Sequence, residues 1–327
     1  MTVAVTGASG HIGANLVRAL VGAGRPVRAL VHRDGRFLDG LPVERAEGDV
    51  RDPASLDRAL AGAETVFHLA ARITIGGEPP AEVHAVNVEG TRNVVEACLR
   101  GGARRLVHFA SIHALSAHPA GEVVDEARSP TGPGAPLYDR SKAEGVRAVL
   151  EGVALGLDAV VVMPTAVIGP ADPAPSRMGQ VLLDLYHGRF PALVDGGFDW
   201  VDVRDVVAGA LAAERRGARG ARYILSGRWA SLEGLAALVA RVEGARPPRL
   251  VCPMWLARAG APLALGWSRL SGTRPLFTPA ALHALRNHRR VSHERAAREL
   301  GWAPRPLEET VADTFEWFRR AQFLHPR

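Results

Sequence analysis

The amino-acid sequence predicts an α/β fold built around a parallel sheet, and two features of the chain support that prediction. Through the first two-thirds of the 327 residues, short apolar strands alternate with amphipathic helical patterns, the spacing typical of βαβ units. A glycine-rich turn follows directly on the first strand and opens the first helix. Together these features indicate a Rossmann-type doubly wound parallel sheet, with a smaller, mainly helical C-terminal substrate subdomain.

Caps and helix-stopping residues set the limits of the predicted elements. Asp52 and Pro53 have the residue types favoured at an N-cap and at the first helical position, and Gly62 ends the helix that they open. Pro164 ends a buried strand. The predicted strands are residues 2–6, 27–31, 65–69, 105–110 and 159–163, and the other helices of this half are residues 12–21, 86–99 and 137–155.

The pattern loosens from Gly169 onwards, where several prolines mark a loop. We therefore expect a dinucleotide-binding domain at residues 1–168, rejoined by about 199–227, and a substrate-binding subdomain at 169–198 and 228–327. In this half we expect a strand at 223–225 and helices at 178–186, 200–214, 232–242, after Pro253, from Thr278-Pro279, at 292–300 and at 307–318.

The composition excludes several classes of protein. Forty basic and 34 acidic side chains give a net charge of +6, but the charges are interleaved and the basic clusters lack stacking aromatic residues, so we expect no nucleic-acid partner. Cys98 and Cys252 are too few for a disulfide framework and fit a reducing compartment. We see no secretory signal and no uninterrupted stretch of about 18 apolar residues, so we expect a cytoplasmic protein without a membrane span. No set of His, Cys, Asp and Glu has metal-ligand spacing.

The glycine turn TGASGHIG has the spacing of a dinucleotide-binding loop. Gly7, Gly10 and Gly13 would let the backbone turn tightly, approach a pyrophosphate and pack the helix on the sheet. At the end of the second strand, an acidic residue would bind the ribose of NAD, but the chain has His32 and Arg33, with Asp34 only afterwards. Because a guanidinium can pair with the 2′-phosphate of NADP, we expect NADP, and Asp34 leaves NAD open.

Three side chains have the arrangement needed for hydride transfer to or from a carbonyl carbon. Tyr138 and Lys142 are four residues apart on a predicted helix, hence on one face. Ser111 follows strand 105–110, at the sheet edge where ligands bind. Tyr138 would exchange a proton with the substrate oxygen, and Ser111 would hold that oxygen. Lys142, the only lysine in the chain, would lower the pKa of the tyrosine from ~10 towards 7. The alternative is a surface Tyr–Lys pair.

The sequence resembles the extended short-chain dehydrogenase/reductase family over nearly its whole length. The motifs are TGASGHIG, Asp49-Val50, His68 to Ala71, Asn87, Ser111, YDRSK and MPTAVIGP. The segments at 200–206 and 297–318 resemble its dihydroflavonol-reductase-like and 3β-hydroxysteroid-dehydrogenase-like branch. Pairing of helices 86–99 and 137–155 across a two-fold axis, giving a homodimer, is a further family-like expectation.

The resemblance gives Ser111, Tyr138 and Lys142 the catalytic roles described above, and it implies that the backbone of residues 165–168 faces the nicotinamide. The glycine loop and the resemblance together predict these cofactor-binding residues: Gly7, Ser9, Gly10, His11, Ile12, Gly13, His32, Arg33, Asp49, Val50, Leu69, Ala70, Ala71, Asn87, Tyr138, Lys142, Pro164, Thr165 and Val167.

Two departures from the family's nucleotide-sugar enzymes favour an uncharged, more apolar substrate. No arginine precedes Trp200 in DGGFDWVDV, and Met163 stands where those enzymes commonly have an arginine. The apolar residues Met254, Trp255, Leu256, Leu263, Leu265 and Trp267 are candidates for a pocket lid. Core packing is the preferred interpretation of each residue singly, and a peripheral membrane contact is a further option. His11 is interpreted as filling a variable position of the glycine loop, and His113 as a candidate for the substrate side without a chemical role.

The sequence therefore predicts an NADP(H)-preferring reductase or dehydrogenase acting on a ketone or secondary alcohol of a largely apolar small molecule. One alternative is a nucleotide-sugar epimerase or dehydratase, which would use the same three residues and retain its cofactor. A second alternative is a dinucleotide-sensing regulator without catalysis.

Overall fold

The computed structural model describes all residues except 1, 75–78, 249, 262–277 and 325–327. Seven parallel strands form the main sheet in the order β10-β6-β5-β4-β1-β2-β3. The order reverses direction between β1 and β4, which is the switch point where open α/β sheets bind ligands. The strands are β1 (Thr2–Thr6), β2 (Val27–Val31), β3 (Glu44–Glu47), β4 (Ala63–His68), β5 (Arg105–Phe109), β6 (Ala159–Pro164) and β10 (Arg222–Leu225).

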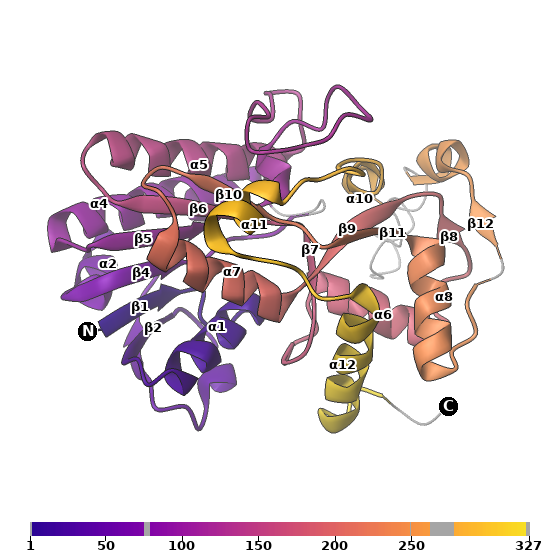
Figure 1. Cartoon of the computed structure of the whole chain (residues 1–327), viewed down its shortest axis with the longest axis horizontal. Helices are drawn as coiled ribbons and strands as arrows, with labels where there is room; N and C mark the ends of the chain where they lie inside the picture. The colour runs from indigo at the N-terminus through magenta and orange to yellow at the C-terminus, as the bar shows by residue number, and fades with distance from the viewer. Residues whose placement is uncertain (1, 75–78, 249, 262–277, 325–327) are drawn as a thin grey trace.

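Helices cover both faces of this sheet (Figure 1). On one face α1 (His11–Gly22) packs on α7 (Val203–Arg216), which also contacts α11 (Glu294–Leu300). On the other face α4 (Gly90–Gly101) packs between α2 (Pro53–Leu60) and α5 (Leu137–Ala154). Shorter turns join these elements: 3-10 turns at Arg36–Leu38 and Ile112–Ala114, the helix α3 (Pro80–His84), and a π-helical turn at Ala85–Glu89 that runs into α4.

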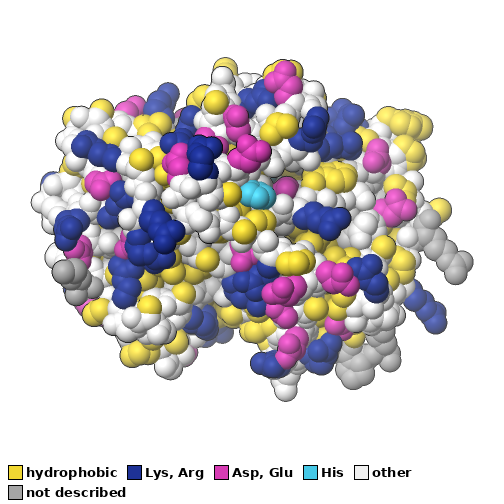
Figure 2. All heavy atoms as spheres, in the orientation of Figure 1, with side chains coloured by type: hydrophobic (Ala, Val, Ile, Leu, Met, Phe, Trp, Pro, Cys, Tyr) yellow, Lys and Arg dark blue, Asp and Glu magenta, His cyan; other side chains and the backbone are white. Residues whose placement is uncertain are grey.

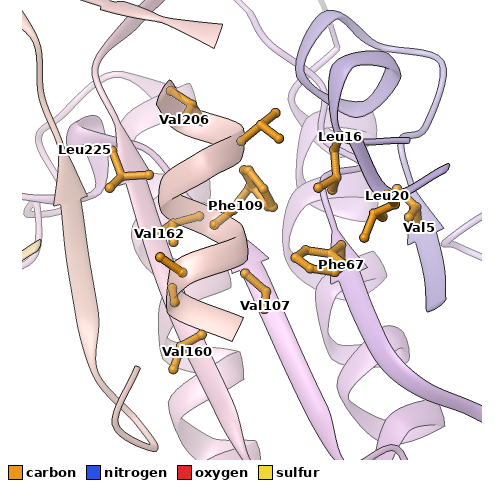
Figure 3. Close-up of a cluster of buried hydrophobic side chains, with 14 of the residues drawn as sticks. Val5, Leu16, Leu20, Phe67, Val107, Phe109, Val160, Val162, Val206 and Leu225 are labelled. Carbon is orange, nitrogen blue, oxygen red and sulfur yellow. The ribbon is translucent and has the colours of Figure 1, made fainter. Parts of the chain in front are cut away.

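Because the central strands are buried on both faces, alternate side chains of each strand enter two separate cores. Along β6, Val160 and Val162 join the core under α1 and α7, whereas Val161 and Met163 join the core under α2, α4 and α5. This alternation fixes the register of the sheet, because a slip of one residue would exchange the two faces. Figure 3 shows the first core, in which Val5, Phe67, Val107, Phe109, Val160, Val162 and Leu225 meet Leu16, Leu20 and Val206.

A second part of the molecule adjoins the sheet on the right in Figure 1. Its own core is rich in leucine, phenylalanine and tryptophan, with Trp200 and Phe315 fully buried. Its strands are β7 (Ala166–Ile168), β9 (Gly197–Asp202) and β11 (Arg228–Ser231) in one sheet, and β8 (Leu193–Val194) and β12 (Val251–Cys252) in another. Its helices are α6 (Arg177–Tyr186), α8 (Leu232–Glu243), α10 (Pro279–Ala284) and α12 (Leu307–Arg320), with residues 254–261 also helical.

The helix predicted at residues 200–214 is wrong at its start. Trp200 to Asp202 belong to β9, which pairs with β7 and β11, and the helix α7 begins only at Val203. The Asp202 carboxylate accepts a hydrogen bond of 2.7 Å from the backbone N–H of Arg204 and caps this helix. Tertiary pairing overrides the helical periodicity here, and the same pairing creates the short strands of the second part, which the sequence pattern did not predict.

The surface seen in Figure 2 carries basic and acidic side chains close together. Many arginines of the described chain are ion-paired, as in Arg204 with Asp202 and Asp313. In the described part of the chain, no helix combines the length and the apolar character that crossing a membrane requires.

Candidate active site

The glycine turn between β1 and α1 is held in a shape that only glycine fits. Gly7 has a φ of +69°, and a Cβ atom there would lie 2.6 Å from the backbone nitrogen of Ala70. A Cβ on Gly13 would collide with the Gly7 carbonyl oxygen. Gly10 is the N-cap of α1 and brings no side-chain cap, so the first N–H groups of the helix stay available to an anion. The turn has the features of a phosphate-binding loop.

Beside the turn lies a cavity of about 310 Å³, which we call the loop-side cavity. Arg33 lines it from the end of β2 and has no hydrogen-bond or ion-pair partner among the described residues. Asp34 is held by Arg36 through hydrogen bonds of 2.6 to 3.1 Å, and these hold the pKa of Asp34 at about 2. The predicted residues that line this cavity are Gly7, Ser9, Gly10, His32, Arg33, Asp49, Val50, Leu69, Ala70 and Ala71.

Asp49 also lines the loop-side cavity. Its carboxylate lies 2.5 Å from Arg51 and 3.0 Å from His32, and the hydrogen bond from Arg51 lowers the pKa of Asp49. The acid is therefore held in its ionised form by the Arg51 guanidinium. Among the described residues that line this cavity, Arg33 is the arginine without an acidic partner, since Arg51 pairs with Asp49 and Arg72 with Glu82.

A second cavity of about 350 Å³, the tyrosine-side cavity, shares Gly7, Gly10, Leu69 and Ala71 with the first. Ser111, Tyr138 and Lys142 all line it, so the structure brings the three predicted catalytic side chains together. Ser111 follows β5, and Tyr138 and Lys142 lie one turn apart on α5. The other predicted residues that line it are Gly7, Gly10, His11, Ile12, Gly13, Leu69, Ala71, Pro164, Thr165 and Val167.

The electrostatics of these three side chains differ from the sequence prediction. Burial raises the pKa of Tyr138 to about 12, and its hydrogen bond with Ser111 opposes that shift. Burial also lowers the pKa of Lys142 to about 8, and its ammonium donates a 2.8 Å hydrogen bond to the Phe109 carbonyl. The protein's own groups therefore do not bring the phenol near neutrality, because desolvation outweighs the favourable contacts.

Asn87 is the one predicted cofactor residue that lines neither cavity. Its amide oxygen accepts from the backbone N–H of Arg72 at 2.7 Å, and its amide nitrogen donates to the Arg72 carbonyl and to Ser141. Asn87 thus fixes the segment after β4, from which Leu69 and Ala71 line both cavities and Ala70 lines the loop-side cavity. Asn87 therefore supports the site without lining either cavity.

His11 ties the glycine turn to the loop after β7. Its Nε2 atom lies 3.2 Å from the Pro170 carbonyl, and its Nδ1 atom lies 3.9 Å from Asp172. The side chain therefore does more than fill a variable position, because it joins the two segments that flank the tyrosine-side cavity.

The described candidates for a pocket lid do not line the tyrosine-side cavity, and Met254 instead follows the core-packing interpretation. Met254 packs in a small core with Val194 and Leu282, whereas Trp255 and Leu256 are exposed, and none of the three lines the tyrosine-side cavity. Leu263, Leu265 and Trp267 lie outside the described residues.

Several residues that line the tyrosine-side cavity were not predicted from the sequence. Asp199 on β9 lines it, accepts hydrogen bonds of 2.7 Å from Thr165 and the Gly227 N–H, and has its pKa raised to about 6 by burial. Asn287 and His288 line it from the segment after α10. No local motif marks these positions, since they reach the cavity only through the tertiary fold. In the described chain, no group of three His, Cys, Asp or Glu side chains could hold a metal ion.

A glycine turn with the features of a phosphate-binding loop, at the switch point of a parallel sheet and next to a cavity lined by Ser111, Tyr138 and Lys142, defines a dinucleotide-binding protein of the oxidoreductase class. Comparison with known proteins agrees. Residues 3–225 match the model of the NAD dependent epimerase/dehydratase family. The chain belongs to this family, the extended short-chain dehydrogenases/reductases, and is an NAD(P)-dependent oxidoreductase, which confirms the resemblance seen in the motifs.

The similarity to individual proteins extends over the whole chain. Sterol demethylase protein B of Methylococcus capsulatus is 40% identical over 98% of both chains. A 3-beta-hydroxysteroid dehydrogenase of Mycolicibacterium neoaurum is 28% identical over 97% of this chain and 91% of its own. Among solved structures, gox2253 superposes with a TM-score of 0.86 at 33% identity, covering 99% of each chain. The Rossmann-type fold predicted from the sequence is confirmed.

Proposed function

We propose that this protein is an NADP(H)-preferring oxidoreductase that transfers a hydride between nicotinamide and a ketone or secondary alcohol of a largely apolar small molecule. The observation that carries the proposal is the common cavity of Ser111, Tyr138 and Lys142, which adjoins the glycine turn. Apart from these polar groups the wall is rich in apolar side chains such as Ile112, Met178 and Phe198. Such a cavity suits an apolar carbonyl compound.

In this proposal, Tyr138 donates its phenolic proton to the carbonyl oxygen during reduction, and Ser111 holds that oxygen with a hydrogen bond. When bound, the nicotinamide supplies the hydride, and its oxidised form adds a positive charge beside the phenol. Lys142 adds a second charge from its position on α5, fixed by the Phe109 carbonyl. These charges would offset the burial that raises the pKa of Tyr138 to about 12.

Arg33 supports the preference for NADP. Its guanidinium lines the loop-side cavity without a partner among the described residues, whereas the nearby Asp34 is engaged by Arg36. A free guanidinium can take a 2′-phosphate in a bidentate pair. With its carboxylate paired, Asp34 is less available to the ribose hydroxyls that NAD would present.

We also propose that the polypeptide is divided as its sequence indicates, with residues 1–168 and 199–227 for the dinucleotide and residues 169–198 and 228–327 for the substrate. Met178, Asn287 and His288, all from the second set, line the tyrosine-side cavity, which supports the division. A homodimer formed through α4 and α5 remains part of the proposal.

The alternative is a nucleotide-sugar epimerase or dehydratase, which the family membership favours. Against it, the segment at 197–202 has no arginine to hold a sugar diphosphate, and Met163 is fully buried in a core. The names of the sterol and hydroxysteroid relatives favour an apolar substrate.

One assay separates these activities. The protein is mixed with NADPH or NADH and either an apolar ketone such as decan-2-one or a nucleotide sugar such as UDP-glucose. We expect NADPH to be oxidised in step with alcohol formation. Conversion of the sugar without net loss of NADPH would establish the alternative. Tight NADPH binding with no turnover across a broad carbonyl panel would indicate a dinucleotide-sensing regulator.

A further inference from the structure

The tyrosine-side cavity has a second polar wall that the hydride-transfer chemistry does not use. His113, in the 3-10 turn after β5, lines the cavity together with Asn287 and His288 from the segment after α10. The ring of His113 is the link between the two walls, with its centroid 6.0 Å from that of Tyr138 and 5.3 Å from that of His288. Polar side chains on a mostly apolar wall call for a ligand group of matching polarity.

Asp139 lies beside the ring of His113, whose buried Nδ1 atom has no hydrogen-bond partner among the described residues. This aspartate follows Tyr138 on α5 and is buried, and its Oδ1 atom lies 3.5 Å from Nδ1 of His113. Its other oxygen lies 4.0 Å from Nε2 of His283. A carboxylate beside Nδ1 favours the tautomer that carries the proton on Nδ1. Since Nδ1 is the buried nitrogen of this ring, the part of His113 that faces the cavity includes Nε2, which then offers a lone pair.

His288 also offers a lone pair. It is 92% buried, and its Nε2 atom lies 3.2 Å from the Leu115 carbonyl. Because a carbonyl only accepts, Nε2 must carry the proton. Burial lowers the pKa of His288 to about 4, so the ring is neutral at pH 7. Its Nδ1 atom is buried and has no hydrogen-bond partner among the described residues, so a ligand reaches this lone pair only after a small shift of the ring. The backbone holds the residue at a φ of +54°.

The two imidazoles therefore present acceptors, and a simple ketone has no donor to give them. We propose that His113 and His288 form a subsite for a hydrogen-bond donor on the substrate, a hydroxyl or N–H group close to the reacting carbonyl. The buried amide nitrogen of Asn287, also without a partner among the described residues, would donate to the oxygen of the same hydroxyl after a side-chain rotation. The substrate class is thus a hydroxylated or amidated apolar ketone. This inference rests on the proposed function.

The test compares ketones that differ only in this group: decan-2-one, 3- and 4-hydroxydecan-2-one, their methyl ethers, and 3-acetamidodecan-2-one. The ethers keep the oxygen but lose the donor. We expect kcat/KM with NADPH to be about tenfold higher for one hydroxy ketone than for its ether, the value of about one hydrogen bond. A preference for the acetamido compound instead would identify an N–H donor as the group that is recognised.

Variants test whether the subsite causes the preference for the hydroxy ketone. The quantity compared is the ratio of kcat/KM for the hydroxy ketone to kcat/KM for its ether, because general effects on catalysis cancel in a ratio measured with one variant. His113→Phe keeps the aromatic contacts and should bring the hydroxy-to-ether ratio close to one. Asp139→Asn should lower or reverse the ratio, because an amide N–H beside Nδ1 favours the opposite tautomer and turns Nε2 into a donor. His118→Asn, at an exposed histidine of the following loop, is the matched control and should keep the wild-type ratio.

Equal kcat/KM for hydroxy ketones, the acetamido ketone and ethers in the wild type would overturn the subsite and leave the reductase proposal intact. The same conclusion follows if His113→Phe keeps the wild-type ratio. If no ketone is reduced, the proposed function fails, and calorimetric binding of the same compounds to the NADP⁺-loaded protein decides the subsite. Selective binding of the hydroxy or acetamido forms that is lost in His113→Phe would support it, and equal binding would refute it.

Discussion

The loop-side cavity lies beside a glycine turn that is a local sequence pattern, whereas the chemistry of the tyrosine-side cavity depends on side chains from distant parts of the chain. Gly7 and Gly10 line the first, Gly13 completes the same turn, and the spacing of the three alone indicates a phosphate-binding loop. The second combines Ser111 after β5, Tyr138 on α5, Asp199 on β9 and His288 after α10. Cofactor recognition is therefore readable from local sequence, and substrate recognition depends on tertiary structure.

The largest effect is expected for Tyr138→Phe, which should lower turnover without weakening cofactor binding. Tyr138→Phe removes the proton donor while keeping the ring that contacts His113. We expect kcat for ketone reduction to fall roughly 10³-fold, the range for loss of a general acid, with the Kd for NADPH little changed. Steady-state kinetics and fluorescence titration of NADPH measure the two quantities. Tyr186→Phe, at a tyrosine that packs against Phe315 away from the cavity, is the control. A variant that retains wild-type turnover would remove the mechanism.

Gly7→Ala should have the opposite signature. The added Cβ would lie 2.6 Å from the backbone nitrogen of Ala70 at a φ of +69°, so the turn must shift away from its phosphate-binding shape. We expect NADPH binding to weaken roughly 100-fold, equivalent to about 3 kcal/mol. Gly22→Ala, at a helical glycine of α1 whose Cβ would meet nothing within 4 Å, should bind NADPH normally. Unchanged affinity in Gly7→Ala would mean that the turn does not hold the phosphates.

The sequence predicts features that depend on local patterns and misses those that depend on contacts between distant residues. The glycine turn, the β1–α1 unit and the Tyr138–Lys142 pair are local patterns, and the structure has each of them at the predicted residues. The strand at Trp200 was mistaken for helix, because its pairing with β7 and β11 involves residues distant in sequence. Likewise, only the burial of Tyr138 shows that desolvation dominates its pKa, and no sequence pattern reports burial at a single position.

Arg33→Ala tests whether the loop-side cavity also selects between dinucleotides. Loss of a charge-assisted pair with the 2′-phosphate costs about 1.5–3 kcal/mol, so the preference for NADPH over NADH should fall roughly 10- to 100-fold. The ratio of kcat/KM for the two cofactors measures it. Arg58→Ala, on the exposed side of α2, should keep the wild-type ratio. A protein that already prefers NADH would contradict the assignment of Arg33 before any variant is made.

Asp199→Asn should have the smallest effect of these variants on activity. It tests how much the buried carboxylate in the wall of the tyrosine-side cavity destabilises the fold. Burial raises the pKa of Asp199 from 3.8 to about 6, so the folded protein binds this proton more tightly than the unfolded chain does. The ionised carboxylate therefore destabilises the fold, by up to about 3 kcal/mol above pH 6, and this penalty fades as the pH falls from 6 towards 3.8. An asparagine oxygen can still accept the hydrogen bonds from Thr165 and the Gly227 N–H. Urea unfolding should thus show a stabilised variant at pH 8 and a smaller gain at pH 5. A variant that is less stable than the wild type at pH 8 would mean that another group stabilises the ionised carboxylate. The buried acid would then lower the free energy of unfolding by less than its raised pKa implies.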